Sequence, residues 1–565
     1  MRGQAVDYPH AAGERKTDVL DAALTVDPDS PESPRDELQA RAAPGQGGRR
    51  DRPGCAVSPP SENVSSSSSG LALDEVAPSR AVPRYGLRVA LVILLAAVFY
   101  ALFGRIVLQG YPYSGDEYST VLQAEGFARG VLKARAPPYA EWAAVDHVVI
   151  DQFVRSKYPP GTAALLSLGV RAGVPWLVIP LLGGLALLVF WFAVRPVLDE
   201  RRAFLAVAFL AASPLFAYQS ATFLSHTPTL LFAALGALVV ALWTRSRRDG
   251  YLVLFGLAVG CAFIIRPVDG ALLGLSLVAV GSLRVLVIAG ASSLPFVGLN
   301  LWYNKLQFGS PFIDGYKAYV PEFVAIYGPS GAASNMSPLH LVEPTQIFHH
   351  LNEFQALIFQ WTVPGTALLA CLGWMALRRE QAAGVRRSAF LQRFLGVMLA
   401  LSVAVALLTF NEPDDSPRPR YLSMMLLPLA FLAAAGWDTA AAFVKKQLGT
   451  RMAWVVGLVI WIAPASLIES YLEHRLPEIK VHTGLGEELA RQNVHSGVVI
   501  LRAEWPTRYA RNGMFFDRPP ILLSVPANVS AAEVAARFPG QEVHEAFEPH
   551  GANPWKHSWV IRRVQ

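Results

Sequence analysis

The stretch that decides the fold is Leu87–Leu108, LRVALVILLAAVFYALFGRIVL, followed almost directly by Gly110–Thr120, GYPYSGDEYST. The first segment is long and apolar enough to cross a bilayer as one helix, which needs roughly 20 residues. The second places two adjacent carboxylates, Asp116 and Glu117, where that helix ends and water begins. Charge at a membrane boundary is costly to keep without a use, so this pair is the first candidate for a functional site.

The rest of the chain repeats the apolar pattern of its first span. Of its 565 residues, 53% are hydrophobic and 16% are charged, whereas a soluble protein carries roughly a quarter charged residues. The mean hydropathy is +0.33. We therefore predict a polytopic α-helical membrane protein with about eleven spans. After the first span they are expected at 175–194, 203–218, 228–243, 251–265, 268–283, 285–303, 355–377, 390–410, 421–437 and 452–470.

Basic residues predict the orientation. Arg84 and Arg88 stand at the start of the first span, which places the N-terminus in the cytoplasm. The apolar segment Pro160–Val170 is too short to cross, so we expect a re-entrant or interfacial helix there. With that segment not crossing, every short loop rich in Arg or Lys falls on the cytoplasmic side. An odd number of spans then leaves the C-terminus outside.

The first external loop, Gln109–Tyr158, contains a second predicted helix. Apolar residues recur at helical spacing after Asp116, namely Val121, Ala124, Ala128 and Val131. We expect an amphipathic helix that begins at Asp116 and lies along the membrane surface.

Two regions outside the spans have the composition of soluble chain. Residues 1–82 are rich in Pro, Ser, Gly, Asp and Arg, which predicts a disordered N-terminal tail. Residues 83–470 then form the transmembrane domain, and residues 471–565 a small α/β domain on the non-cytoplasmic face. The elements expected in that domain are helices at 485–492 and 530–538 and strands at 497–501, 520–525 and 559–564.

Two interpretations of Asp116 and Glu117 remain open. Asp is a good helix N-cap and Glu in a first turn suits the helix dipole, so the pair could simply begin a helix. Alternatively, Asp116 is a general base that takes the proton of an attacking hydroxyl. Glu117 would then orient the acceptor or help to hold a cation.

Cationic residues at predicted external helix ends are candidate phosphate ligands. Lys157 opens the motif Lys-Tyr-Pro-Pro-Gly, and Arg418 and Arg420 belong to Arg-Pro-Arg-Tyr. Arginine can bind phosphate through two parallel hydrogen bonds. Each candidate has a structural alternative. Lys157 could be an interfacial anchor, and the arginines could pair with Asp414 and Asp415.

Other polar features have simpler explanations. Arg266 and Asp269 are expected to form an internal ion pair, and His226 is expected to be a polar residue at a helix end. The acidic residues Glu141, Asp146 and Asp151 share the first external loop, which leaves a divalent cation beside Asp116 open, but their spacing selects no metal.

Several function classes have no support. The chain has no HExxH, GxSxG or P-loop motif and no GxGxxG in a βαβ context, so hydrolase, ATPase and dinucleotide functions are not indicated. The net charge is +6, and its basic residues cluster in short loops. This pattern is typical of membrane orientation and not of nucleic-acid binding.

The order of these motifs resembles the GT-C superfamily of membrane glycosyltransferases over residues 87–470. The shared features are the first span, the external Gly-Asp-Glu loop, Lys-Tyr-Pro-Pro-Gly before a short helix, Arg-Pro-Val-Asp, and Arg-Pro-Arg-Tyr before a late span. The most similar branches are the bacterial protein O-mannosyltransferase-like and aminoarabinose-transferase-like enzymes of the glycosyltransferase family 39 type. The sequence lacks a clear second Asp-x-Asp motif, so metal dependence is left undecided.

The resemblance implies a function and a site. It implies inverting transfer of a sugar from a polyprenyl-phosphate donor to a lipid, glycan or protein acceptor, on the non-cytoplasmic face of a bacterial plasma membrane. By position in the motif, the resemblance implies that Asp116 is the catalytic base and that Glu117 is the residue beside it. Lys157 corresponds to a residue that contacts the donor phosphate, and Arg420 lies near the lipid-phosphate pocket.

A transporter or lipid flippase is the main alternative. Such a protein would favour charges near the middle of spans and inverted internal repeats. Asp116 and Arg420 instead lie at the ends of spans, and the sequence shows no internal repeat. A non-catalytic membrane scaffold is the third alternative.

Overall fold

The computed structural model describes residues 85–280, 282–327, 351–383, 389–408, 418–548 and 559–564. The predicted tail over 1–82 lies outside these residues, and so does most of the charged loop that ends at Arg420. The described residues belong to one unit by their contacts.

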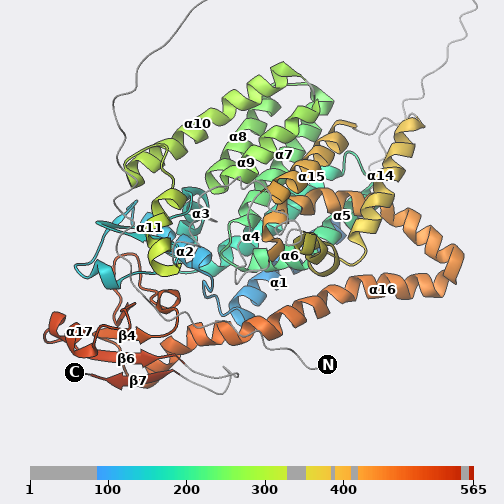
Figure 1. Cartoon of the computed structure of the whole chain (residues 1–565). Helices are drawn as coiled ribbons and strands as arrows, with labels where there is room; N and C mark the ends of the chain where they lie inside the picture. Colours follow the sequence, from blue (N-terminus) through green and yellow to red (C-terminus); the bar gives the residue numbers. More distant parts are fainter. Residues whose placement is uncertain are drawn as a thin grey trace, which may run out of the picture. The chain divides into compact units, whose positions relative to one another are not determined.

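A bundle of apolar helices forms the larger part of this unit (Figure 1). In the described residues, six helices are long and apolar enough to cross a membrane, or up to eight if two bent pairs each count as one span. The six are α1 Gly86–Leu102 with its continuation Phe103–Val107, α4 Pro175–Val194, α7 His226–Ser246, α10 Leu283–Phe308, α15 Ala389–Leu408 (to Leu407 as a span) and the stretch Pro419–Ser466, which includes the first part of α16 Leu426–Arg491. The bent pairs are α5 Glu200–Ala211 with α6 Pro214–Ala221, and Leu351–Trp361 with α14 Thr366–Ala382.

The multi-pass helical class is confirmed, but the number of eleven spans is not. Helices α8 Gly250–Ile265 and α9 Pro267–Leu275 coincide with predicted spans and are shorter than a span should be. The predicted spans 421–437 and 452–470 fall in α16 except for residues 421–425, and α16 is interrupted at Gly449 by non-helical backbone (φ 79°, ψ 168°).

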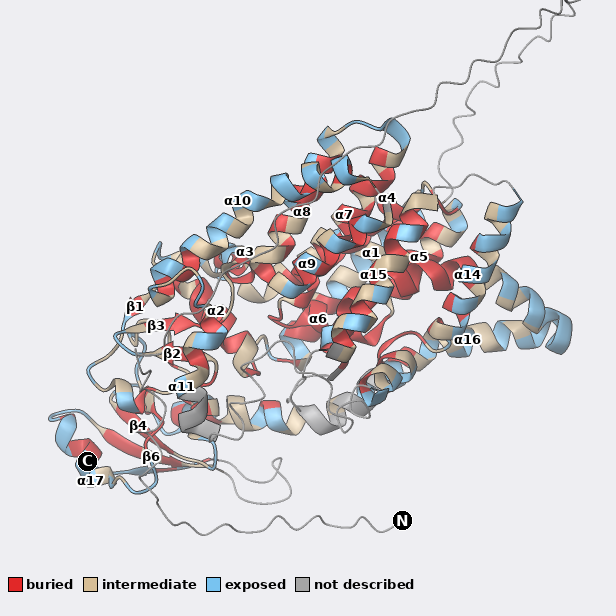
Figure 2. Ribbon diagram, turned by 45° about the horizontal axis from the view of Figure 1, so that its top comes forward, coloured by how far each residue is buried: buried red, intermediate tan, exposed pale blue. Residues whose placement is uncertain are grey.

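Lipid-facing surfaces are visible in the pattern of burial. Helix α10 exposes Leu283, Leu294 and Trp302, and α16 exposes Trp454 and Leu458, each with more than half of its surface accessible. Figure 2 shows α10 and much of α16 as exposed or half-buried, whereas the helices between them are largely buried. Large apolar side chains exposed in long stripes mark surfaces that another apolar medium covers.

Helices α14 and α16 approach each other closely because both carry glycine at the crossing. A Cβ atom on Gly373 would collide with the carbonyl oxygen of Leu432, and one on Gly436 with that of Leu369. Small residues that let two backbones approach are typical of helix packing in membranes.

The first loop contributes a small sheet and helix α2, Gly115–Ala128. Strands β1 Ala134–Arg135, β2 Val148–Ile150 and β3 Phe153–Ser156 form an antiparallel sheet in the order β1-β3-β2. The predicted short helix is confirmed as α3, Pro160–Arg171, which begins with proline in its first turn and is not among the candidate spans. Helix α11, Gly315–Tyr327, follows α10.

Helix α2 is not the surface helix expected from its pattern. None of its residues is exposed. Ala124 packs with Ala163 of α3, while Leu122 packs on the other side with Met514 from the C-terminal part of the chain. The prediction of one free face was wrong because the residues that cover it are almost 400 positions away in the sequence.

The C-terminal residues form a four-stranded sheet in the order β5-β4-β6-β7. Strand β4, Val498–Arg502, is parallel to β5, Ile521–Leu523, and to β6, Val543–Phe547. Strand β7, Val560–Arg563, is antiparallel to β6, and α17 covers Ala531–Arg537. The three predicted strands and the capped helix are confirmed, but the helix expected at 485–492 is the end of α16, and β6 was missed. A domain boundary at residue 471 stays a prediction.

Candidate active site

Helix α2 begins with a capping residue that is not Asp116. Ser114 is the N-cap, and its hydroxyl oxygen accepts a hydrogen bond from the backbone N–H of Glu117 at 3.3 Å. The expectation that Asp116 opens the helix was therefore wrong by two positions. Because Ser114 performs the capping, the carboxylate of Asp116 is available for other contacts.

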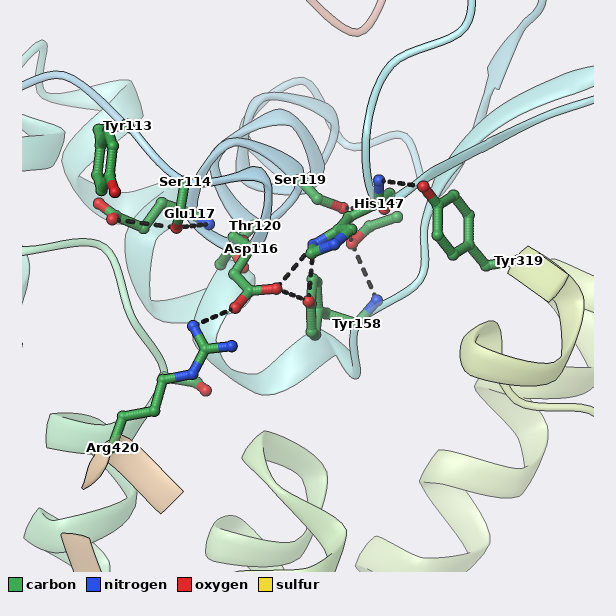
Figure 3. A network of polar contacts seen from close by, with 12 residues as sticks. Tyr113, Ser114, Asp116, Glu117, Ser119, Thr120, His147, Tyr158, Tyr319 and Arg420 are labelled. Atoms are coloured by element: carbon green, nitrogen blue, oxygen red, sulfur yellow. Dashed lines mark hydrogen bonds and ion pairs between the residues drawn. The ribbon is translucent and has the colours of Figure 1, made fainter. Parts of the chain in front are cut away.

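The carboxylate of Asp116 is the centre of a polar cluster (Figure 3). One oxygen, Oδ2, lies 2.7 Å from Nη1 of Arg420. The other, Oδ1, lies 2.7 Å from Nδ1 of His147 and accepts a hydrogen bond from the hydroxyl of Tyr158. That hydroxyl is also 3.0 Å from His147 Nδ1. Four segments thus meet at one carboxylate: α2, the residue before β2, the residues after β3, and the 3₁₀-helix η5, Arg418–Met425.

The environment gives the two adjacent carboxyl groups different proton affinities. Burial alone would raise the pKa of Asp116, but Arg420 and His147 hold it well below its usual value. Burial raises the pKa of Glu117 to about 7, although hydrogen bonds from Phe223 and Ser114 oppose the shift. Asp116 is therefore ionised at neutral pH, while Glu117 titrates there. Pairs of carboxyl groups whose pKa values are pushed apart are a mark of acid–base sites.

Glu117 points away from the cluster around Asp116. It is 2% exposed, accepts a hydrogen bond from the Ser114 hydroxyl at 3.2 Å, and accepts another from the backbone N–H of Phe223 at 3.2 Å. These contacts tie the start of α2 to the segment between α6 and α7. The predicted roles of Glu117, orienting an acceptor or holding a cation, stay predictions.

Lys157 belongs to the same cluster. It is 8% exposed, and its ammonium group lies 5.1 Å from the ring centre of Tyr319 and 5.3 Å from those of Tyr158 and Tyr316. Its charge also contributes to the low pKa of Asp116. Gly315 at the start of α11 packs so closely over Lys157 that a Cβ atom there would collide with the Lys157 carbonyl oxygen.

Arg420 is 4% exposed and bridges two partners. Besides Asp116, its guanidinium donates to the Tyr421 hydroxyl at 2.9 Å. Arg418 begins the same 3₁₀-helix, and its side chain lies outside the described residues. The alternative partners Asp414 and Asp415 also lie outside them, so that pairing is untested.

A second layer of polar groups surrounds Tyr421. The predicted ion pair of Arg266 with Asp269 is confirmed, and Arg266 also donates to the Ser225 hydroxyl at 3.3 Å. The Arg266 guanidinium lies 5.8 Å from the Tyr421 ring centre, and the His226 ring lies 6.3 Å from it. His226 is 3% exposed, and in the described part of the chain neither of its ring nitrogens has a hydrogen-bond partner.

Two of the three acidic residues that the first loop offers as cation ligands pair with arginines instead. Glu141 pairs with Arg537, and Asp151 pairs with Arg155. Among the residues that the structure describes, no group of three or more His, Cys, Asp or Glu side chains could hold a metal ion.

No sequence pattern indicated His147, which the structure places in contact with Asp116. His147 has left-handed backbone (φ 64°), which is uncommon for a residue other than glycine. Its backbone N–H donates to the Tyr319 hydroxyl at 2.9 Å, and its carbonyl accepts from Ser119 at 2.6 Å and from the Lys157 N–H at 3.3 Å. Only tertiary contacts hold this residue in place, so local sequence could not reveal it.

Comparison with known proteins supports a glycosyltransferase of the GT-C type. Residues 159–296 match the family model of dolichyl-phosphate-mannose-protein mannosyltransferases. No curated protein matches this sequence.

The fold itself has solved relatives. ArnT from Cupriavidus metallidurans, bound to undecaprenyl phosphate, is 14% identical, and the match covers 85% of this chain and 98% of that chain with a TM-score of 0.51. The archaeal oligosaccharyltransferase AglB from Archaeoglobus fulgidus is 13% identical, with coverage of 81% and 69% and a TM-score of 0.42. The GT-C fold expected from the sequence motifs is thus confirmed by its likeness to ArnT.

Proposed function

We propose that this protein transfers a sugar from a polyprenyl-phosphate donor to an acceptor hydroxyl, with Asp116 as general base. The observation that carries the proposal is the 2.7 Å contact between Asp116 and Arg420, with Lys157 in the same cluster. A base and two phosphate-binding cations thus meet at one point. ArnT, which has this fold, binds undecaprenyl phosphate, and the matching family model describes transferases that use a dolichyl-phosphate sugar.

The reaction needs only a base and a site for the leaving phosphate. The acceptor oxygen attacks the anomeric carbon, and Asp116 takes the hydroxyl proton. The bond between that carbon and the phosphate oxygen breaks, and the polyprenyl phosphate leaves with the bonding electrons. Arg420 and Lys157 stabilise the negative charge on the leaving phosphate. A single displacement inverts the configuration at the anomeric carbon.

The pairing of Asp116 with Arg420 implies an order of events. While Arg420 contacts Asp116, the carboxylate is a weak base, because the cation holds its pKa well below the usual value. A donor phosphate competes for the same guanidinium, since bidentate contact with phosphate is strong. Donor binding therefore restores the basicity of Asp116, and we expect the donor to bind before the acceptor.

The second layer around Tyr421 offers further groups to the donor. His226 is buried and has no hydrogen-bond partner among the described residues, and an unpaired buried polar group costs free energy. The guanidinium of Arg266 lies beside the Tyr421 ring, which is also the neighbour of the His226 ring. We assign both residues to the part of the site that receives the phosphate or the sugar hydroxyls.

The charge distribution supports a site on the non-cytoplasmic face. Helix α7 begins at His226 beside the site and has 21 residues, which is about 30 Å of helix. Its other end carries Arg245, and at that end of the bundle Arg202 of α5 pairs with Glu380 of α14 at 2.7 Å. Basic helix ends favour the cytoplasm. The N-terminus would then be cytoplasmic and the C-terminus external, in a bacterial plasma membrane.

Sugar transfer in proteoliposomes tests the proposal. Wild type and Asp116→Asn are supplied with labelled polyprenyl-phosphate sugars and with hydroxyl acceptors of lipid, glycan and peptide type. Transfer by wild type that falls by at least about a hundredfold in the folded Asn variant supports the base. Equal transfer by both would exclude Asp116 as the base, and movement of donor across the bilayer without transfer would support a lipid flippase.

A further inference from the structure

The segment between β4 and β5 lies against the start of α2. Arg511 in this segment donates one hydrogen bond to the carbonyl oxygen of Pro112 and one to that of Tyr113. These two residues directly precede the N-cap Ser114 and lie three and four positions from Asp116. One guanidinium therefore holds two successive carbonyl groups at the entry to the catalytic helix.

Other contacts fix the same segment to the body of α2. The Tyr118 hydroxyl donates to the carbonyl oxygen of Asn512, and the backbone N–H of Met514 donates to the Glu125 carboxylate at 3.2 Å. Met514 is 1% exposed and fills the space beside Gly126, where a Cβ atom would collide with its sulfur. The segment follows α2 along most of its length.

The segment is in turn anchored to the C-terminal sheet. The Asn512 side chain accepts a hydrogen bond from the Leu522 N–H and donates to the Leu522 carbonyl, both at 2.8 Å, and Leu522 lies in β5. From the other direction, Trp142 of the first loop is 5% exposed and packs in the core of the sheet with Ile500 and Leu523. The first loop and the sheet thus fold against each other.

We propose that the C-terminal sheet is part of the catalytic framework and that Arg511 is a positioning residue for Asp116. Arg511 does not contact the reacting groups, but it fixes the backbone from which α2 starts and so the direction of the Asp116 side chain. A misplacement of about 1 Å in a catalytic group can cost roughly a hundredfold in rate. The catalytic part of this inference rests on the proposed sugar transfer.

Replacing either of two arginines of the same segment by alanine tests the proposal in the full-length protein. Arg511→Ala removes both hydrogen bonds before Asp116. Arg518→Ala removes an exposed ion pair to Glu125, 2.9 Å long, in the second half of α2. We expect Arg511→Ala to lower kcat by at least about tenfold with donor KM within about twofold of wild type, and Arg518→Ala to leave both near wild type. Arg511→Lys, which can keep one of the two hydrogen bonds, should restore part of kcat.

Hydrogen exchange of the backbone amides in 109–121 gives a readout that does not need activity. We expect faster exchange in Arg511→Ala and unchanged exchange in Arg518→Ala. Equal kcat losses in the two variants, or unchanged exchange in Arg511→Ala, would overturn the positioning role. If wild type transfers no sugar, the proposed function fails, and the exchange measurement alone still decides whether Arg511 holds this segment.

Discussion

Asp116 and Glu117 are neighbours in the sequence, yet their side chains lie in different surroundings (Figure 3). Asp116 contacts Arg420, whereas Glu117 contacts the N-cap hydroxyl and the backbone of Phe223. Successive residues on a helix point about 100° apart, which is enough to send one carboxylate into a cationic cluster and the other into the protein interior. One residue can thus serve the reaction while the other holds the helix.

The raised pKa of Glu117 predicts a pH-dependent stability. Because the pKa is about 7 in the folded protein and 4.5 for an unperturbed glutamate side chain, the folded state binds the proton more tightly. Stability from this group is present below pH 4.5 and is lost as the pH rises through 7. Glu117→Gln keeps an acceptor for Phe223 and cannot ionise, so it should stabilise the protein at pH 8 by an amount on the order of 1–3 kcal/mol.

Thermal unfolding in detergent at several pH values measures this effect. The gain in Glu117→Gln should shrink toward zero as the pH falls to 4.5. A gain of the same size at pH 4.5 and pH 8 would mean that Glu117 is not protonated in the folded protein at neutral pH.

Lys157 gives a second prediction at the scale of single residues. Lys157→Met keeps most of the side-chain volume among the three tyrosine rings and removes the charge. A hydrogen bond to a charged group contributes about 1.5–3 kcal/mol, so donor KM should rise by roughly ten- to a hundredfold. Acceptor KM should change little. Titration of donor and acceptor in turn separates the two constants, and an unchanged donor KM would exclude Lys157 from the phosphate site.

The elements of this fold were predictable where local pattern decides them. Leu87–Leu108 and Pro160–Val170 appear as helices because their composition and proline placement favour them, and Ser530 caps α17 as its motif indicates. The burial of α2 and the placement of His147 were not predictable. Both depend on residues distant in the sequence, such as Met514 and Tyr319, whose proximity is a property of the folded chain.

The crossing of α14 and α16 supplies a prediction at the scale of elements. Gly436→Ala places a methyl group against the Leu369 carbonyl, whereas Gly457→Ala, also in α16, meets no atom within 4 Å. Gly436→Ala should therefore lower the unfolding temperature, because the two helices must separate, at an expected cost of about 1–3 kcal/mol. Gly457→Ala should be neutral or stabilising, since alanine favours helix more than glycine. Equal behaviour of the two variants would contradict the close crossing.

At the scale of the whole molecule, the two ends of the helix bundle carry different sets of polar groups. One end carries the polar cluster and the contacts to the C-terminal sheet, and the other carries ion pairs such as Arg202 with Asp438 and Arg284 with Asp249. In the proposed reaction, the apolar helices between them hold the polyprenyl chain, and Arg420 holds its phosphate at the membrane boundary. A donor recognised by its lipid and its phosphate would need no nucleotide-binding motif.

The orientation of the bundle can be measured with two single-cysteine variants. Ala172→Cys lies just after α3 at the end of the bundle that carries the site, and Ser246→Cys lies at the opposite end of α7. Both positions are exposed. They are introduced into a chain whose own cysteines, Cys55, Cys261 and Cys371, have been replaced by serine.

If the positive-inside tendency orients this protein, an impermeant maleimide added to intact cells should label Ala172→Cys and leave Ser246→Cys unlabelled until the membrane is opened. The opposite result would place Asp116 and Arg420 on the cytoplasmic face, and the donor would then have to present its phosphate there. Labelling of both from one side would mean an even number of crossings between them, so that α4, the α5–α6 pair and α7 do not all cross. Asp116 and Ala172 both lie between the first span and α4, and α3 is not among the candidate spans. The two residues are therefore expected on the same face, so that labelling Ala172→Cys also reports the side of the membrane on which Asp116 lies.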